Sequence, residues 1–207
     1  MEDILDLYEE PYDPKRPVIG VDERPCQLIG DIVAPIPMKP GKLRKEDNEY
    51  ERNGTCSVFI ACEPLTGWRY VEIRKQRTKM DYAEFMNRIS EHYTGASAIR
   101  VVQDNLNTHN AGSFYERFDP EKARNLKNLF EFHYTPKKGS WLNMAEIELS
   151  ALARQCLDRR IGDMEILERE AKAWEKDRNE QKIMIHWQFT TNHAREKLER
   201  HYKAVKN

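Results

Sequence analysis

The sequence lacks several features that define common classes of protein. Its 207 residues contain no run of 18 apolar residues, so it offers no candidate membrane span. The first ten residues, MEDILDLYEE, are acidic and lack the basic start and apolar core of a signal peptide, and we therefore expect a cytoplasmic protein. Only nine glycines are present, none in a GxGxxG or GxxxxGK[ST] pattern, which argues against a nucleotide-phosphate loop.

The four cysteines also lack the spacing that zinc ligands show. Cys26, Cys56, Cys62 and Cys156 include no CxxC pair and have no nearby histidine at zinc-ligand spacing. We therefore expect buried free thiols in a reducing compartment.

An excess of basic charge is absent overall, because the net charge is −1 at pH 7. The charge is nevertheless uneven: residues 1–31 carry −6, which leaves +5 on the other 176 residues. Basic residues cluster at 39–45, at 69–79 and at Lys137 and Lys138. Such runs are usually solvated faces, so they only support, and do not establish, contact with nucleic-acid phosphates.

The order of the apolar runs predicts an α/β fold. Short runs rich in β-branched and aromatic residues at 18–23, 55–64, 67–76, 98–104 and 130–136 are typical of strands, the second and third forming a hairpin. Helical spacing covers 79–93 and 119–129, and 31–54 is predicted to be a long surface loop. The alternation indicates a mixed β-sheet flanked by helices.

The chain divides into three predicted parts. Residues 1–17 form an acidic proline-containing arm or linker, because prolines at 11, 14 and 17 resist helix and ladder alike. Residues 18–160 form the core, and 161–207 form a helical C-terminal extension packed on it. Ser140 is predicted to cap a helix whose apolar stripe is Leu142, Ala145, Leu149, Leu152 and Cys156.

Two aspartates stand at the ends of predicted strands. Asp22 follows VIGV and Asp104 follows VVQ. Ligands of such sheets collect outside the strand ends, and two acids placed there would repel each other unless a divalent cation lay between them. A third carboxylate on an adjoining helix would complete a two-metal site.

Glu146 is the better candidate for that third carboxylate. On a helix, positions 146 and 148 differ by about 200°, so only one of the two glutamates can face the aspartates. Glu146 stands beside Leu142 and Ala145 at the margin facing the sheet, whereas Glu148 is expected on a face farther from it. The alternative is that Asp22 and Asp104 only form turns and that Glu146 is a solvent-exposed helix residue.

Three motifs carry a resemblance to a known family. They are VDE around Asp22, QDNLNTH after Asp104, and YTPKKGSWLNMAEIELSAL around Glu146. Together they resemble the catalytic domain of bacterial insertion-sequence transposases of the mariner superfamily, over nearly the whole chain. The resemblance implies an RNase H-like fold with a helical C-terminal region, and a DDE triad of Asp22, Asp104 and Glu146. It also implies two Mg²⁺ ions held by these acids, with Mn²⁺ as a substitute.

The same resemblance implies cleavage of DNA at the element ends followed by strand transfer into target DNA. The expected partners are the terminal repeats, the target DNA and further copies of the chain, in a homodimer or larger transpososome, with no membrane partner. Members of the family carry an N-terminal helix-turn-helix region, which we do not find before the first strand. We therefore expect an upstream helix-turn-helix polypeptide or a truncated copy.

Other residues are candidates for DNA binding or for supporting the triad. Asn105 and His109 could orient a metal-bound water or a phosphate, and for His109 surface exposure is an open alternative. Trp141 could stack on a base, although packing on the sheet is favoured. The full set is Asn105, His109, Lys137, Lys138, Trp141 and Asn143.

The C-terminal part is expected to form a helical cap over the sheet, with a protomer contact as the alternative. Thr190 or Thr191 would cap a final helix from about Asn192. Two other functions stay open: a catalytically silent DNA-bridging subunit of a decayed element, and an RNase H-like nuclease without a role in transposition.

Overall fold

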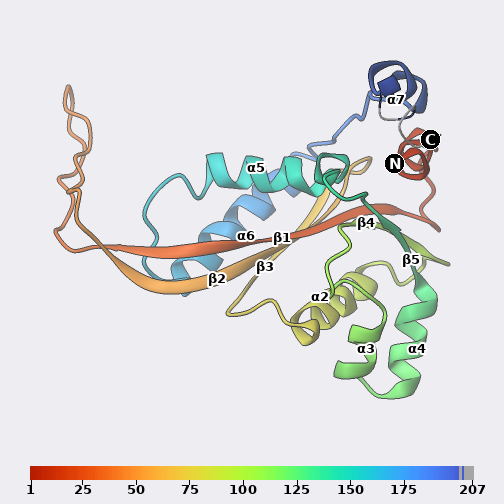
Figure 1. The fold of residues 1–207 in the computed structure, drawn as a ribbon. Helices are drawn as coiled ribbons and strands as arrows, with labels where there is room; N and C mark the ends of the chain where they lie inside the picture. Colours follow the sequence, from red (N-terminus) through yellow and green to blue (C-terminus); the bar gives the residue numbers. More distant parts are fainter. Residues whose placement is uncertain (201, 203–207) are drawn as a thin grey trace.

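A five-stranded mixed sheet forms the centre of the computed structural model, which describes residues 1–200 and 202 (Figure 1). Strands β1 (Val18–Asp31), β2 (Tyr50–Glu63) and β3 (Trp68–Arg74) pair antiparallel. Strands β4 (Ile99–Gln103) and β5 (Phe130–Tyr134) extend the sheet in parallel on the other side of β1, giving the order β3-β2-β1-β4-β5. The predicted strands and the hairpin between the second and third are confirmed.

Three helices cover one face of the sheet. They are α2 (Lys79–His92), α3 (Gly112–Arg117) and α4 (Pro120–Leu129), of which the sequence did not predict α3. Side chains alternate between the two faces along β1, so Ile19 and Val21 point to the same face. There they are buried against the aromatic residues of α2 and α3, which explains why these helices pack on this side.

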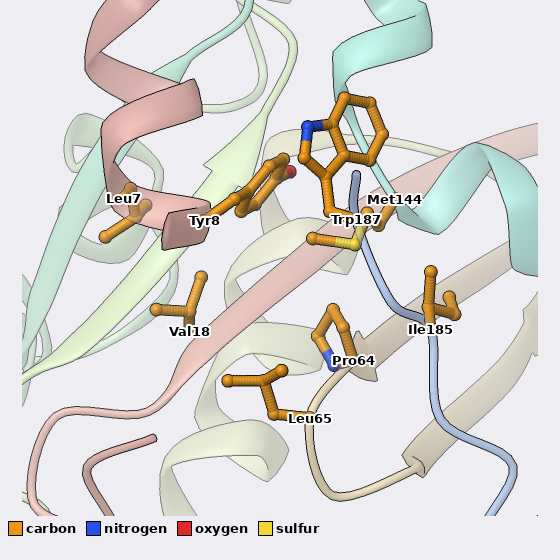
Figure 2. A pocket seen from close by; sticks show the side chains of 8 residues that line it. All are labelled: Leu7, Tyr8, Val18, Pro64, Leu65, Met144, Ile185 and Trp187. Atoms are coloured by element: carbon orange, nitrogen blue, oxygen red, sulfur yellow. The ribbon is translucent and has the colours of Figure 1, made fainter. Parts of the chain in front are cut away.

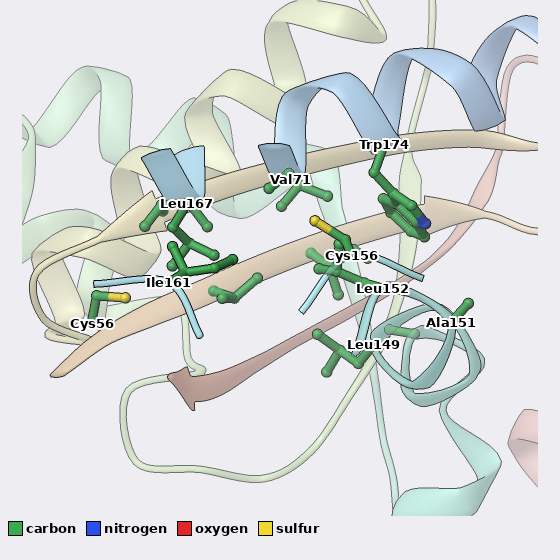
Figure 3. Close-up of a cluster of buried hydrophobic side chains, with 14 of the residues drawn as sticks. Cys56, Val71, Leu149, Ala151, Leu152, Cys156, Ile161, Leu167 and Trp174 are labelled. Atoms are coloured by element: carbon green, nitrogen blue, oxygen red, sulfur yellow. The ribbon is translucent and has the colours of Figure 1, made fainter. Parts of the chain in front are cut away.

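Helices α5 (Ala145–Gln155) and α6 (Met164–Glu180) cover the opposite face (Figure 3). The predicted apolar stripe is buried on this face. Ser140, however, does not cap the helix. It begins a short 3₁₀ turn (Ser140–Leu142), and α5 starts only at Ala145, after an N-cap residue, Met144, whose side chain makes no capping hydrogen bond. A serine before an apolar stripe fits either arrangement, so the local pattern could not decide between them.

The N-terminal segment is a helix, and the expectation of an arm or linker is wrong for its first half. Helix α1 (Glu2–Glu9) buries its apolar side chains against Val102, Leu142 and Ala194, the last on α7 (Thr191–Lys197). The prolines at 11, 14 and 17 all follow the helix, so they end it and do not prevent it. Thr190 caps α7, as predicted.

Strands β1 and β2 are longer than the sequence predicted. Their ladder continues through Cys26↔Cys56 to Asp31↔Tyr50, which shortens the predicted loop to residues 32–49. These residues form an arm that projects from the body of the protein (Figure 1). Its exposed large apolar side chains are Ile32, Val33, Ile36, Met38 and Leu43.

The cysteines are unpaired thiols, as expected, with three of them buried and Cys26 half-buried. In residues 1–200 and 202, no helix has both the length and the apolar character that crossing a membrane requires.

Candidate active site

The register of two parallel strands places Asp22 level with Asp104. The expectation that Asp22 ends a strand is wrong, because β1 continues to Asp31, whereas Asp104 does follow the end of β4. Val18 pairs with Arg100 and Gly20 with Val102, and the same register continued by two positions reaches Asp22 and Asp104. Since Val21 is buried under α2, alternation turns the Asp22 side chain to the opposite face, where α5 lies.

Asn143 joins the start of α5 to β1 directly beside Asp22. Its Nδ2 donates to the Val21 carbonyl at 2.8 Å, and its Oδ1 accepts from the Ala145 backbone N–H at 3.1 Å. Gly20 makes this approach possible, because a Cβ there would stand 2.8 Å from Asn143 Oδ1 and 3.0 Å from the Ala145 nitrogen. Asn143 is 1% exposed, so it supports the site and is not positioned to contact DNA.

Asp22 and Glu146 line one open pocket as a result. Burial raises the pKa of Asp22 to about 7, and the negative charges of Glu146, Glu23 and Asp104 add to the shift against a hydrogen bond from the Glu23 N–H. In the part of the chain that the structure describes, neither Asp22 nor Glu146 forms an ion pair with a side chain of the protein. Both carboxylates thus lack a paired cation, although Arg24 and Arg154 also line this pocket.

Glu148 has the opposite environment. It is fully buried, and Arg69 on β3 donates to both of its oxygens at 2.6 and 2.9 Å. Arg178 on α6 adds hydrogen bonds of 3.2 and 3.0 Å. The expectation that Glu148 lies away from the sheet is therefore wrong: it points toward β3, and its carboxylate is already satisfied.

Asp104 follows the last residue of β4, and its side chain is 45% exposed. Its Oδ1 lies 2.6 Å from Nδ1 of His109, whose Nε2 lies 2.7 Å from Oε2 of Glu23. Burial lowers the pKa of His109, but the two carboxylates outweigh burial and raise it to about 9. Contact with His109 in turn lowers the pKa of Asp104. His109 is 2% exposed, so its surface alternative is wrong.

Glu23 lies in the VDE motif but was not predicted as a site residue. The feature that could have indicated Glu23 is its place as a second acid in the strand, on the face that α2 buries. Burying a carboxylate there without a cation beside it costs free energy. Only the fold shows that the cation beside Glu23 is His109, from the loop after β4.

The remaining polar candidates gather on the other side of Asp104. Asn105, Lys137 and Lys138 are exposed and line a second open pocket together with Asp104. Two cations beside an acid at a strand end suit a phosphate backbone that approaches the carboxylates.

Trp141 does not pack on the sheet as expected. It is 46% exposed, and its ring lies 6.3 Å from that of Trp187 and 5.6 Å from that of Phe189. The C-terminal segment between α6 and α7 supplies these rings, and nothing in the local sequence around Trp141 could have indicated them.

A separate cavity of about 30 Å³ lies between α1, β1 and the C-terminal segment (Figure 2). Figure 2 shows that apolar side chains line it, among them Leu7, Val18 and Ile185. Its size admits little more than a water molecule and its walls offer that water few partners, so it is a packing gap and not a substrate site.

The donor set at the first pocket suits a hard divalent cation. In residues 1–200 and 202, no three His, Cys, Asp or Glu side chains already stand in a metal-binding arrangement. The chemistry of the donors nevertheless fits, because carboxylate oxygens are the ligands that Mg²⁺ prefers, and the negative charge of Glu146 contributes to the raised pKa of Asp22.

The mixed sheet with helices on both faces has the RNase H-like fold, with Asp22 on β1, Asp104 after β4 and Glu146 at the start of α5. The chain belongs to the DDE superfamily endonucleases, whose family model matches residues 17–168. No curated protein matches the sequence.

Solved structures share the fold. A chain of the simian T-cell lymphotropic virus intasome in complex with PP2A regulatory subunit B56 gamma aligns at a TM-score of 0.50 and 9% identity, covering 76% of this chain and 47% of that one. The Mos1 transposase paired-end complex with left transposon end aligns at 0.46 and 15%, covering 88% and 58%. The HTLV-2 integrase catalytic core domain in complex with magnesium aligns at 0.43 and 10%, covering 77% and 86%. The chain spans about half the length of the first two.

Proposed function

We propose that this chain is the catalytic domain of a DNA transposase, which cuts DNA at the ends of its element and joins them to target DNA. Membership of the DDE superfamily endonucleases supports the class of reaction. The observation that carries the proposal is the open pocket shared by Asp22 and Glu146, whose carboxylates form no ion pair among the described residues although Arg24 and Arg154 also line the pocket.

Asp22, Asp104 and Glu146 would hold two Mg²⁺ ions, for which Mn²⁺ would substitute. The chemistry that these ions supply when bound is activation of the attacking oxygen and stabilisation of the leaving oxygen. The protein's own residues set the geometry. Asn143 fixes the start of α5 against β1, and Lys137 and Lys138 bring positive charge to the side from which a DNA backbone would approach.

Paired assemblies with DNA are part of the proposal. The solved structures with this fold include an intasome and a paired-end complex with a transposon end. A homodimer or larger transpososome on element ends and target DNA would suit this chain, in the cytoplasm, with an upstream helix-turn-helix polypeptide supplying end recognition. The projecting arm of residues 32–49 supports assembly, because it exposes apolar side chains that the rest of the chain does not cover.

The direct test is metal-dependent nicking of a supercoiled plasmid by the purified chain. We expect nicking with Mg²⁺ or Mn²⁺, and a loss of about 100-fold or more in Asp22→Asn, since even groups that only support a metal ligand contribute 10–100-fold. Glu168→Gln, an exposed acid on α6, is the matched control and should nick as the wild type does.

The products distinguish the alternatives. Joining of a cut 3′ end to a second DNA supports transposition, whereas nicking without any joining indicates a nuclease. DNA binding that is insensitive to metal and yields no cut strand would overturn the enzymatic proposal in favour of a DNA-bridging subunit.

A further inference from the structure

His109 lies between two carboxylates that come from different parts of the chain. Its Nδ1 is 2.6 Å from Asp104 Oδ1, and its Nε2 is 2.7 Å from Glu23 Oε2. The ring therefore spans from β1 to the loop after β4, around the end of the sheet. Asp22 and Glu23 are adjacent on β1, so the contact from Glu23 through His109 links Asp104 to the residue next to Asp22.

The His109 ring is held firmly in this position. It stacks on Tyr82 with ring centroids 4.8 Å apart, and the Tyr82 hydroxyl donates to Gln103 at 2.8 Å. The His109 carbonyl accepts from Gln103 Nε2 and from the Tyr134 hydroxyl, each at 3.1 Å. A ring fixed by stacking and by its own backbone can determine where its neighbours lie.

Glu23 depends on His109 for its neutralisation. The Glu23 side chain is 3% exposed, and its other cationic neighbour, Arg77, stands 3.9 Å away and is 52% exposed. Asp104 is different, because its side chain is 45% exposed and water could solvate it without any protein partner. Burial explains the contact between Glu23 and His109, but it does not explain why the same ring also reaches Asp104.

We propose that Glu23 and His109 form a positioning pair that fixes the Asp104 carboxylate for metal binding. The proposal rests on the proposed function, in which Asp104 is a metal ligand. Asp104 stands just past a strand end, where the Leu106 N–H donates to its Oδ1 at 3.2 Å. His109 adds a side-chain contact to the same oxygen at 2.6 Å, which ties that orientation to β1 through Glu23. Side chains that contact and orient a ligating carboxylate from outside the ligand set contribute about 10–100-fold to metal affinity or activity.

The test measures Mn²⁺ binding to the whole chain, by the electron paramagnetic resonance signal of free Mn²⁺, together with thermal unfolding. We expect Glu23→Ala and His109→Ala to weaken Mn²⁺ binding about tenfold or more. Glu23→Gln keeps the length of the side chain and an acceptor oxygen beside His109 Nε2, and it should stay within about threefold of the wild type.

Glu63→Gln is the matched control, because Glu63 is also buried, at 4% exposure, and also accepts a hydrogen bond, from Thr66 at 2.5 Å. It should change the melting temperature as much as Glu23→Gln does and leave Mn²⁺ binding unchanged. Because the Gln variant keeps the shape of the side chain and its acceptor oxygen, it remains informative even where an Ala variant fails to fold.

Three results overturn the proposal. If wild-type Mn²⁺ affinity survives in His109→Ala and Glu23→Ala, the pair is only structural. If Glu23→Gln loses as much affinity as Glu23→Ala, the charge of Glu23 acts on the metal directly. If the wild-type chain binds no Mn²⁺, or if Asp22→Asn binds Mn²⁺ as well as the wild type does, the metal-dependent function itself fails. The positioning role then fails with it.

Discussion

Two glutamates on one helix have opposite environments, and this difference decides which of them is available for chemistry. Glu146 opens into the pocket with Asp22, whereas Glu148 is enclosed by Arg69 and Arg178. A carboxylate that already accepts from two guanidinium groups offers no free lone pair in the right direction to a metal ion. The structure therefore supports Glu146 and makes Glu148 a stabilising residue.

Glu148→Gln should destabilise the protein. The substitution leaves Arg69, at 1% side-chain exposure, without its counter-charge, and breaking a buried pair in this way costs about 3–5 kcal/mol. Urea denaturation gives the free energy of unfolding. Glu180→Gln, an exposed acid on α6, is the control and should change it by less than about 0.5 kcal/mol. Equal stability of the two variants would contradict a stabilising role for Glu148.

The same pair predicts a pH dependence. Burial raises the pKa of Glu148, but its hydrogen bonds with Arg69 and Arg178 outweigh burial and lower it below 4.5. A carboxyl with a lowered folded-state pKa contributes stability above its unfolded pKa and loses it as the pH falls through the folded value. The wild type should therefore lose stability below about pH 4.5, measured by denaturation between pH 6 and 3, and Glu148→Gln should lose less over that range.

At the scale of elements, the junction between β1 and α5 positions the pocket. No side chain separates the two elements at Gly20, and Asn143 bridges them by hydrogen bonds to Val21 and Ala145. The distance between Asp22 and Glu146 therefore depends on a glycine two residues before the aspartate.

Gly20→Ala should push α5 away from β1. The added Cβ would stand 3.0 Å from the backbone nitrogen of Ala145, which cannot rotate aside, and overpacking of this kind costs about 1–3 kcal/mol. We expect a lower melting temperature and weaker metal-dependent nicking. Gly95→Ala is the control, because its Cβ would meet nothing within 4 Å, and it should be neutral or slightly stabilising. Unchanged nicking by Gly20→Ala would show that α5 is not held at this point.

At the scale of the whole molecule, the two ends of the described chain pack together. Arg195 on α7 donates to both oxygens of Glu2 at 2.8 and 2.9 Å, and Thr191 donates to Asp6 at 2.6 Å. Beneath these polar contacts, α1 covers Val102, the residue two before Asp104. The first helix is thus part of the support of β4.

Leu5→Ala should test that support. Leu5 is fully buried, and removing a buried leucine side chain costs about 2–5 kcal/mol. Leu43→Ala, in the arm at 82% exposure, is the matched control and should leave the melting temperature unchanged. If the Leu5→Ala protein were as stable as the control, residues 1–9 would not contribute to stability and would be only a linker.

The sequence predicted the parts of the fold that rest on local periodicity. The strands at 98–104 and 130–136 and the helix at 79–93 are present because their apolar residues repeat at the spacing of the element. Strand ends were less predictable. The outer parts of β1 and β2 are strands because they pair with each other, and this pairing joins residues far apart in the sequence. Helix α1 was missed because the prolines after it dominated its interpretation.

The sequence by itself determined the sheet-and-helix order, the face of each apolar stripe and the position of Asp104 after a strand, because each depends on residues a few positions apart. Only the tertiary structure decided that Glu148 is neutralised by Arg69 and Arg178, and that His109 lies between Glu23 and Asp104. Those partners are separated from one another by as many as 86 positions along the chain, as from Glu23 to His109. Burial and charge at a site depend on which distant segments meet there, and packing of the whole chain brings those segments together.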